Sequence, residues 1–445
     1  MPRQQRRVVI TGTGPIAAPG LGIEAIWSAL CEGRSGVGPC SIFDASGFSC
    51  PFVAQLPPDR FDVRQVVPKS YRKATKVMSR DIELAVGAAH EAVRSAGLVT
   101  KAHEPADGRM TVPADRMGCH IGAGLIAAEE NELTAALATS RKPDGGFDIA
   151  AWGATGMQNL TPLWMLKYLP NMLACHVTIC HDCQGPSNTI TCGEASALLS
   201  IGESMRVIGR GAADACLSGG AESKVNLMAI LRQQFAGRLA KAAAGDDPTK
   251  TVRPFARDAI GGVAGEGGGI LVLEAAESAK ARGAAVLAEL AGFAATQSFC
   301  PDTVGADPCR DGEGISDAML AALQDAGMKP AEIDAVVPFG CGAPALDAAE
   351  AAAIRRVFGD RAASLPLVTL SPLIGNCGAG FGAVAAAVAV QCLQTGMLPA
   401  RVNGDASLGV DAAPAAARKA DLRSILVCTP SLGGQNAAIV LRRVA

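Results

Sequence analysis

The alternation of short apolar runs with longer helical stretches constrains the fold of this chain most. The runs are rich in Val, Ile, Leu and Ala, and they lie at residues 8–10, 117–121, 215–217, 270–273, 335–337 and 425–427. Residues 81–96 and 315–326 carry apolar side chains at helical spacing, and each stretch ends before a glycine. This rhythm predicts an α/β protein with a mostly parallel sheet. Because each stretch precedes a similar loop and strand, we expect two related halves that join near residues 281–284.

Length, composition and charge exclude several classes of protein. A chain of 445 residues is long enough to bury one large core or two joined cores, and its hydrophobic content of 49% argues against disorder. A net charge of −2 provides no basic field for nucleic acid or an anionic membrane. The start, MPRQQRRVVITGTG, has no signal-peptide core, and the apolar run at residues 383–390 is too short to span a bilayer. We therefore expect a cytoplasmic protein that binds neither nucleic acid nor membrane.

The densest group of possible metal ligands is CHVTICHDC, residues 175–183. Structural zinc sites usually use two ligand pairs separated by an intervening segment, whereas these ligands crowd into nine residues with strand-like alternation through His176, Thr178 and Cys180. We therefore expect no metal and no cofactor. The 15 cysteines of the chain are better explained as small core residues than as a disulfide framework.

One stretch, GPSNTITCGEASALLSIGES at residues 185–204, has the pattern of a nucleophile elbow. Small residues lead into a turn, and a helix rich in Ala, Leu and Ile follows. The residue at the turn is Glu194, nine residues after Gly185 and eight before Gly202. The nearby Cys192 lies upstream of the helix N-terminus, where backbone N–H groups would stabilise an oxyanion, so we interpret it as a small buried thiol.

Several blocks of the chain, in order, resemble the β-ketoacyl synthases of fatty-acid and polyketide assembly. The blocks are RRVVITGTGPIAAPG at 6–20, WSALCEGRSGVGPCSIFDASGF at 27–48, YLPNMLACHVTI at 168–179, GPSNTI at 185–190, VAGEGGGILVLE at 263–274, PALDAAEAAAIRRVFGD at 344–360 and SLGGQNAAIVLRR at 431–443. The resemblance covers nearly the whole chain. It implies a thiolase-like fold of two βαβαβαββ halves stacked in five α/β/α/β/α layers, with dimerisation near the active site. We place the halves at residues 1–284 and 285–445.

The resemblance also implies a catalytic pattern, from which this chain departs. Family members load an acyl group on a Cys at the N-terminus of a buried helix, and two His residues assist decarboxylation of a malonyl thioester. Glu194 stands at the family Cys position. Phe339 and Asn376 stand at the two His positions, and Ser371 stands at a family Lys position. No shift of alignment restores the histidines, because the five His residues of the chain are 90, 103, 120, 176 and 181.

These replacements exclude the Claisen condensation for this chain alone. A phenyl ring offers no proton, and an amide is no base near neutral pH, so neither Phe339 nor Asn376 supplies the decarboxylation chemistry. The family RDGF block reads AIGG at residues 259–262, and the C-terminal GFGG reads SLGG at 431–434, which removes an aromatic gate. We expect Leu432 of this block to line the substrate tunnel or a subunit interface.

Three interpretations of Glu194 remain open from the sequence. Its carboxylate could be a structural group held at a helix N-terminus, or it could be a general base or nucleophile in acyl-thioester hydrolysis, decarboxylation or transfer. Third, the chain resembles chain-length factors, which pair with an active ketosynthase and shape the pocket in which a chain grows on acyl carrier protein. The structural and third interpretations together form the leading hypothesis. Within residues 123–161, Trp152 and Met157 are then candidates for the tunnel floor. A homodimeric scaffold that binds acyl carrier protein is a further alternative.

Overall fold

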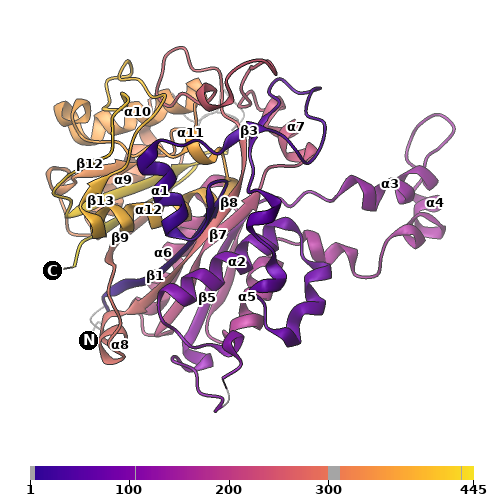
Figure 1. Ribbon diagram of the computed structural model, residues 1–445, viewed down its shortest axis with the longest axis horizontal. Helices are drawn as coiled ribbons and strands as arrows, with labels where there is room; N and C mark the ends of the chain where they lie inside the picture. Colours follow the sequence, from indigo (N-terminus) through magenta and orange to yellow (C-terminus); the bar gives the residue numbers. More distant parts are fainter. Residues whose placement is uncertain (1–5, 106, 299–310, 432, 445) are drawn as a thin grey trace.

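The computed structural model describes residues 6–105, 107–298, 311–431 and 433–444 (Figure 1). Its centre is a large mixed sheet in the order β10-β13-β14-β9-β1-β8-β7-β5-β6. The predicted strand segments all lie in strands. The bounds of these strands are β1 Val8–Ala17, β5 Met117–Ala123, β6 Ser187–Ile190, β7 Ala215–Ser223, β8 Ala264–Ala275, β9 Ala288–Gln297, β10 Ala335–Val337, β13 Ser424–Pro430 and β14 Gln435–Arg442.

The N-terminal half follows the expected order β1, α2, β5, α5, β6, α6, β7, β8, and its helices are α2 Arg80–Ser95, α5 Met172–His181 and α6 Ser196–Gly209. Strands β6, β5 and β7 run parallel, whereas β8 is antiparallel to both β7 and β1. The C-terminal half contains β9, α9 Glu313–Asp325, β10, α10 Pro344–Phe358, α12 Phe381–Thr395, β13 and β14. Only the β10–β13 pair is parallel among its named strand pairs.

The prediction of a mostly parallel sheet is therefore wrong. Each half ends in a pair of neighbouring antiparallel strands, and β1 also pairs antiparallel with β9 of the other half. Strand direction depends on partners far away along the chain, and apolar runs bounded by glycine do not encode it. The pairing of Val9 with Glu289 and of Ile10 with Ala288 links the strands of the two halves, whose two parts of the sheet lie on opposite sides of α12.

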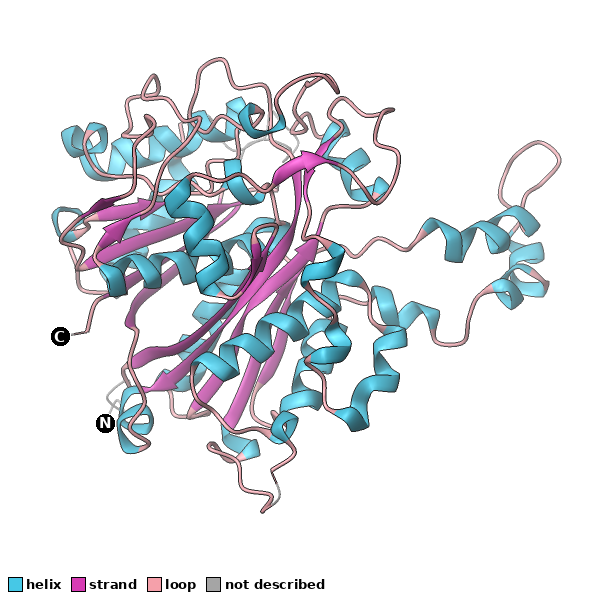
Figure 2. Cartoon of the chain, viewed as in Figure 1, coloured by secondary structure: helices cyan, strands magenta, loops and turns pink. Residues whose placement is uncertain are grey.

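The expected five layers are confirmed. Helices α2 and α5 cover the outer face of the N-terminal strands, while α6 and α12 cover their inner face and contact each other. Helix α12 also packs on β13, and α9 covers the opposite face of β9 and β14 (Figures 1 and 2). Small residues permit this close stacking, since a Cβ atom at Gly14 would lie only 2.1 Å from the Ala88 carbonyl oxygen of α2.

The central helix α12 is apolar and buried from Phe381 to Val390, because strands of both halves cover it. Among the described residues, Gly378–Thr395 is the one helix long and apolar enough to cross a membrane, yet 83% of this stretch is buried inside the molecule. Its side chains are mainly Ala and Val, which bury apolar surface without separating the layers.

Helix α5 corrects the interpretation of the CHVTICHDC segment. The strand-like alternation is wrong, because residues 172–181 form a helix whose Leu173, Val177 and Cys180 are buried at helical spacing against the neighbouring layer. His176 Nδ1 and the Tyr71 hydroxyl oxygen form a hydrogen bond of 2.8 Å. No group of three or more His, Cys, Asp or Glu residues suited to a metal ion occurs in the part of the chain that the structure describes.

A helical arm projects from the body near residue 123 (Figures 1 and 2). It contains α3 Glu130–Thr139 and α4 Ile149–Ala154. Several of its apolar side chains are exposed, namely Leu137, Phe147, Ile149, Met157, Leu163 and Met165. The arm therefore carries apolar surface that this chain does not cover itself.

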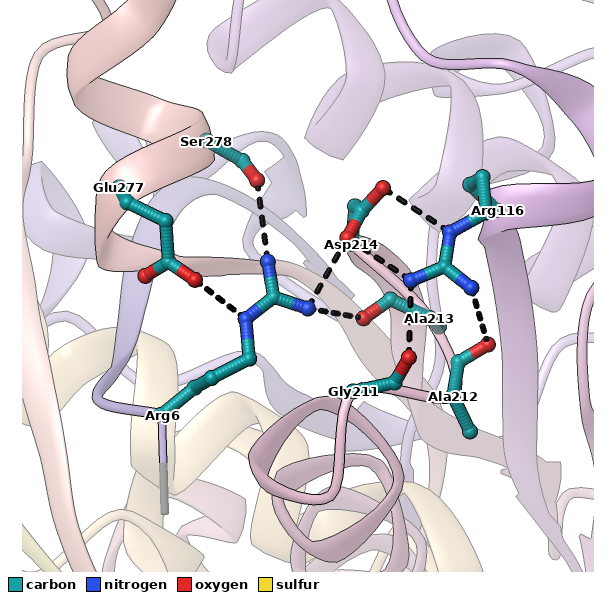
Figure 3. A network of polar contacts seen from close by, with 8 residues as sticks. All are labelled: Arg6, Arg116, Gly211, Ala212, Ala213, Asp214, Glu277 and Ser278. Atoms are coloured by element: carbon teal, nitrogen blue, oxygen red, sulfur yellow. Dashed lines mark hydrogen bonds and ion pairs between the residues drawn. The ribbon is translucent and has the colours of Figure 1, made fainter. Parts of the chain in front are cut away.

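Several polar contacts hold Arg6, which lies just before β1 (Figure 3). The Arg6 guanidinium donates to the Asp214 carboxylate at 2.9 Å, and the Arg116 guanidinium donates to the same carboxylate at 2.9 and 3.0 Å. Arg6 also pairs with Glu277 on α8, Ala276–Ala281. Asp214 thus links the approach to β1, the start of β5 and the start of β7.

Candidate functional site

The elbow that carries Glu194 is a 3₁₀ turn, Gly193–Ala195, between β6 and α6. Gly193 has a φ of +55°, a conformation that favours glycine. The Ser196 hydroxyl fixes the turn, because it accepts from the Cys192 N–H at 2.8 Å and donates to the Gly193 carbonyl at 2.6 Å. This local structure places the Glu194 side chain inward with an exposed fraction of only 2%.

Glu194 takes part in a buried polar cluster that connects the two halves. The Asn376 side-chain amide donates to Glu194 Oε1 at 3.1 Å, and Lys224 Nζ lies 3.8 Å from the same oxygen. Lys224 Nζ also lies 3.3 Å from Glu222 Oε1, and the other carboxylate oxygen of Glu222 accepts from the Ala379 N–H at 2.7 Å. We call Glu194, Lys224, Glu222 and Asn376 the elbow cluster.

Burial and neighbouring charges shift the pKa values of Glu194 and Lys224 in opposite directions. Burial favours a neutral Glu194, but the Lys224 ammonium, the Arg238 guanidinium and the Asn376 amide together lower the pKa of Glu194 to about 2. Burial likewise favours a neutral Lys224, but Glu222 and Glu194 raise its pKa above the ordinary value. Both groups are therefore charged at neutral pH. A carboxylate with a pKa near 2 is a poor general base, so its electrostatics favour the structural interpretation of Glu194.

Phe339, which the resemblance predicts to stand at the first family His position, is packed among other hydrophobic side chains. Its side chain is completely buried, and its ring meets the Phe381 ring edge to face with 4.8 Å between the centroids. The Phe339 N–H and the Gly340 N–H each donate to the Glu350 carboxyl group at 2.8 Å. Burial raises the pKa of Glu350 to about 8 in spite of these two bonds. The phenyl ring itself carries no proton that it could transfer to a substrate.

The side chains of Asn376 and Ser371 form hydrogen bonds with backbone groups of neighbouring residues and loops. Asn376 Oδ1 accepts from the Gly378 N–H at 2.8 Å, while its backbone N–H donates to the Val263 carbonyl at 2.9 Å. Ser371 begins the short helix α11, Ser371–Ile374, and its hydroxyl donates to the Phe339 carbonyl at 3.0 Å. The structure therefore joins Glu194 with Asn376, and Phe339 with Ser371.

The remaining predicted residues lie elsewhere or outside the described part. Trp152 is on α4 of the arm, where its ring lies 5.6 Å from the Phe147 ring, and the side chain of Met157 is 54% exposed. Neither belongs to the elbow cluster, so their role as a tunnel floor stays a prediction. Leu432 lies outside the described residues. Cys192 is half-buried, and burial raises the pKa of its thiol, which disfavours a reactive thiolate.

Sequence reasoning missed three residues of this region: Glu222, Lys224 and Arg238. The sequence carried a signal for two of them. Glu222 and Lys224 closely follow the predicted strand at residues 215–217, in the otherwise small and apolar run LSGGAESKV, and both are buried in the structure. Charged side chains are rarely buried without partners. The identity of those partners depends on contacts across the sheet.

A five-layered α/β fold with a turn-to-helix elbow between its halves defines a thiolase-like protein. Models of the β-ketoacyl synthase N-terminal and C-terminal domains match residues 5–279 and 287–405. A 3-oxoacyl-[acyl-carrier-protein] synthase 2 of Vibrio cholerae is 32% identical over 450 residues, which cover 99% of this chain and all of the relative. The chain belongs to the β-ketoacyl synthase family.

Two solved structures extend the comparison. The ishigamide ketosynthase/chain length factor has a TM-score of 0.82 and 28% identity, and the match covers 99% of this chain and 100% of the other. A β-ketoacyl synthase from Burkholderia phymatum also has a TM-score of 0.82, with 26% identity and the same coverage of both chains. The fold is thus shared with ketosynthases.

Proposed function

We propose that this chain is a non-condensing ketosynthase-like subunit of the chain-length-factor type. In this role it pairs with an active ketosynthase in polyketide or polyene assembly on acyl carrier protein. The observation that carries the proposal is that Glu194 forms an ion pair with Lys224 and that Phe339 packs against Phe381. The resemblance predicts a thiol at the position of Glu194 and an imidazole at the position of Phe339. The likeness to a solved ketosynthase/chain length factor supports this assignment.

The exposed arm supports a partner subunit. Ile149 and Leu163 are 73% and 67% exposed in the single chain, and both lie on the projecting segment between residues 124 and 170. Apolar side chains gathered on a projecting element favour burial against another protein. A partner ketosynthase would cover this surface, and Trp152 and Met157 would then border the partner's substrate tunnel.

A basic surface supports binding of a negatively charged carrier protein. Exposed positive side chains gather on and beside the 3₁₀ segment Lys69–Val77, and they are Arg64, Lys69, Arg72, Lys73 and Lys76. The chain as a whole carries a net charge of −2, so this local excess is specific to the segment. Such a patch would steer an acidic partner to this face.

The test is reconstitution with an active ketosynthase. We expect the purified chain alone, and its Glu194→Cys variant, to form no condensation product from acyl and malonyl thioesters, because Phe339 and Asn376 supply no acid–base chemistry. Co-expression should give a stable complex that elongates a carrier-bound chain, and Glu194→Gln in that complex should change the rate by less than about threefold, since it removes no reacting group.

Product analysis by mass spectrometry and gel filtration measure these outcomes. The proposal is wrong if no complex forms while the homodimer itself turns over an acyl thioester. That result would favour an independent enzyme that uses Glu194. A homodimer that binds acyl carrier protein without any turnover would favour the scaffold alternative.

A further inference from the structure

Arg238 is a buried charged residue near the elbow cluster whose guanidinium lacks hydrogen-bond partners in the described part of the chain. It follows α7, Leu227–Phe235, and only 7% of the residue is exposed. Both terminal nitrogens of its guanidinium are buried and have no hydrogen-bond partner among the described residues. Leaving a buried charged donor unsatisfied is costly, so such a group needs a water, an ion or a ligand.

The backbone holds Arg238 in this position. Its N–H donates to the Gln233 carbonyl at 3.0 Å, and its carbonyl accepts from the Gly262 N–H at 2.9 Å. These bonds attach the residue both to the end of α7 and to the segment that leads into β8. The guanidinium is therefore part of a fixed structure rather than a loose surface group.

A small hollow lies beside this guanidinium. It is lined by Arg238, Gln233, Cys341 and Asn376, together with residues 262–264 and Leu239. The volume of the hollow is about 10 Å³. This is close to the minimum that holds one water molecule. Asn376 also bonds to Glu194, so the hollow adjoins the elbow cluster.

The carboxylates of the elbow cluster do not satisfy Arg238. Lys224 pairs with both Glu194 and Glu222, and no ion pair to Arg238 is found in the described part of the chain. Lys224 therefore has two carboxylates within 4 Å, whereas Arg238 has none among the described side chains. An incoming anion would be the direct partner that the guanidinium lacks.

We infer that Arg238 binds a carboxylate group, one oxygen of which enters the hollow. A planar carboxylate matches the two terminal nitrogens of a guanidinium and can place a single oxygen in a space of this size. A phosphate group is bulkier at its anionic end and fits less well. The carboxylate could belong to a free small acid, or to the end of an acyl group on a carrier, and only this second source rests on the proposed function.

The experiment uses the isolated full-length chain with sodium acetate as the probe. At constant ionic strength and an acetate concentration near ten times its Kd, we expect the melting temperature to rise by about 2 °C. Acetamide, the neutral analogue, should give no rise. Arg238→Met should abolish the acetate effect, whatever its own melting temperature without acetate, because the rise is measured against the same variant in acetate-free buffer.

Controls separate this site from general ion effects. Arg257→Met removes an exposed arginine outside the hollow and should keep the acetate response. Arg238→Lys keeps the charge but lacks the planar guanidinium, so we expect a smaller acetate response. This variant also provides the test if Arg238→Met fails to fold. Equal responses of the wild type and Arg238→Met, or a larger response to phosphate than to acetate, would overturn the inference. The acetate experiment contains no partner subunit. A negative result would therefore contradict the carboxylate site and would not bear on whether this chain pairs with a ketosynthase.

Discussion

Lys224→Met is expected to lower the free energy of unfolding by about 3–5 kcal/mol at pH 7, because it leaves Glu194 and Glu222 buried without their shared cation. Lys224 is the one side chain that pairs with both carboxylates in the described residues, at 3.8 and 3.3 Å. Urea unfolding followed by circular dichroism measures the loss. Lys280→Met, at an exposed position on α8, is the matched control and should change stability by less than about 0.5 kcal/mol.

The double variant Glu194→Gln/Lys224→Met should recover part of this loss. It removes one of the two stranded carboxylates and leaves the position able to accept from Asn376. If the losses of the two single variants simply add, Glu194 and Lys224 do not interact, and the assignment of the elbow cluster as a structural ion pair is wrong.

The pH dependence of stability provides a second measure of the same interaction. The folded-state pKa of Glu194 is about 2, below its ordinary value of 4.5, so its contribution is fully present above pH 4.5 and is lost as the pH falls toward 2. The wild type should therefore exceed Glu194→Gln in stability at pH 6, and the difference should shrink as the pH falls below 4.5. A difference that stays constant from pH 6 to pH 3 would contradict the lowered pKa.

Ile149→Asp combined with Leu163→Asp should weaken the subunit complex by at least about 100-fold, because it buries two carboxylates in an apolar interface. Both residues are among the most exposed apolar side chains of the arm. Analytical ultracentrifugation of the chain with its partner ketosynthase gives the dissociation constant. The fold of the isolated chain should be retained, since both side chains face away from the core.

Leu320→Asp is the matched control for the arm variant. Leu320 is 42% exposed on α9, on the other side of the molecule from α3 and α4 (Figure 1). Its substitution should leave the affinity of the complex unchanged. Undiminished affinity in the arm variant would place the partner on another face, and equal weakening by both variants would indicate general destabilisation.

Much of the fold could be predicted because local patterns encode it. The apolar runs at residues 8–10 and 117–121 lie in β1 and β5, and the periodic stretch at 81–96 differs from α2 by one residue at each end. Strand direction could not be read in this way, as the antiparallel β8 shows, and the short apolar pattern around His176 did not distinguish a strand from a helix. The boundary of the halves at residue 284 stays a prediction.

The sequence by itself determined that no histidine follows His181, because counting the histidines requires no coordinates. From this and from the spacing around Glu194, it predicts that the catalytic groups of the family are absent. Only the tertiary structure decided what takes their place. Lys224 reaches Glu194 because the end of β7 lies beside the elbow, and Asn376 reaches it from the other half of the chain. The same folding buries the two terminal nitrogens of Arg238 with no hydrogen-bond partner among the residues that the structure describes. Charge pairing acts over a few ångströms in space, and the chain brings distant residues to that distance only after the sheet and its layers have formed.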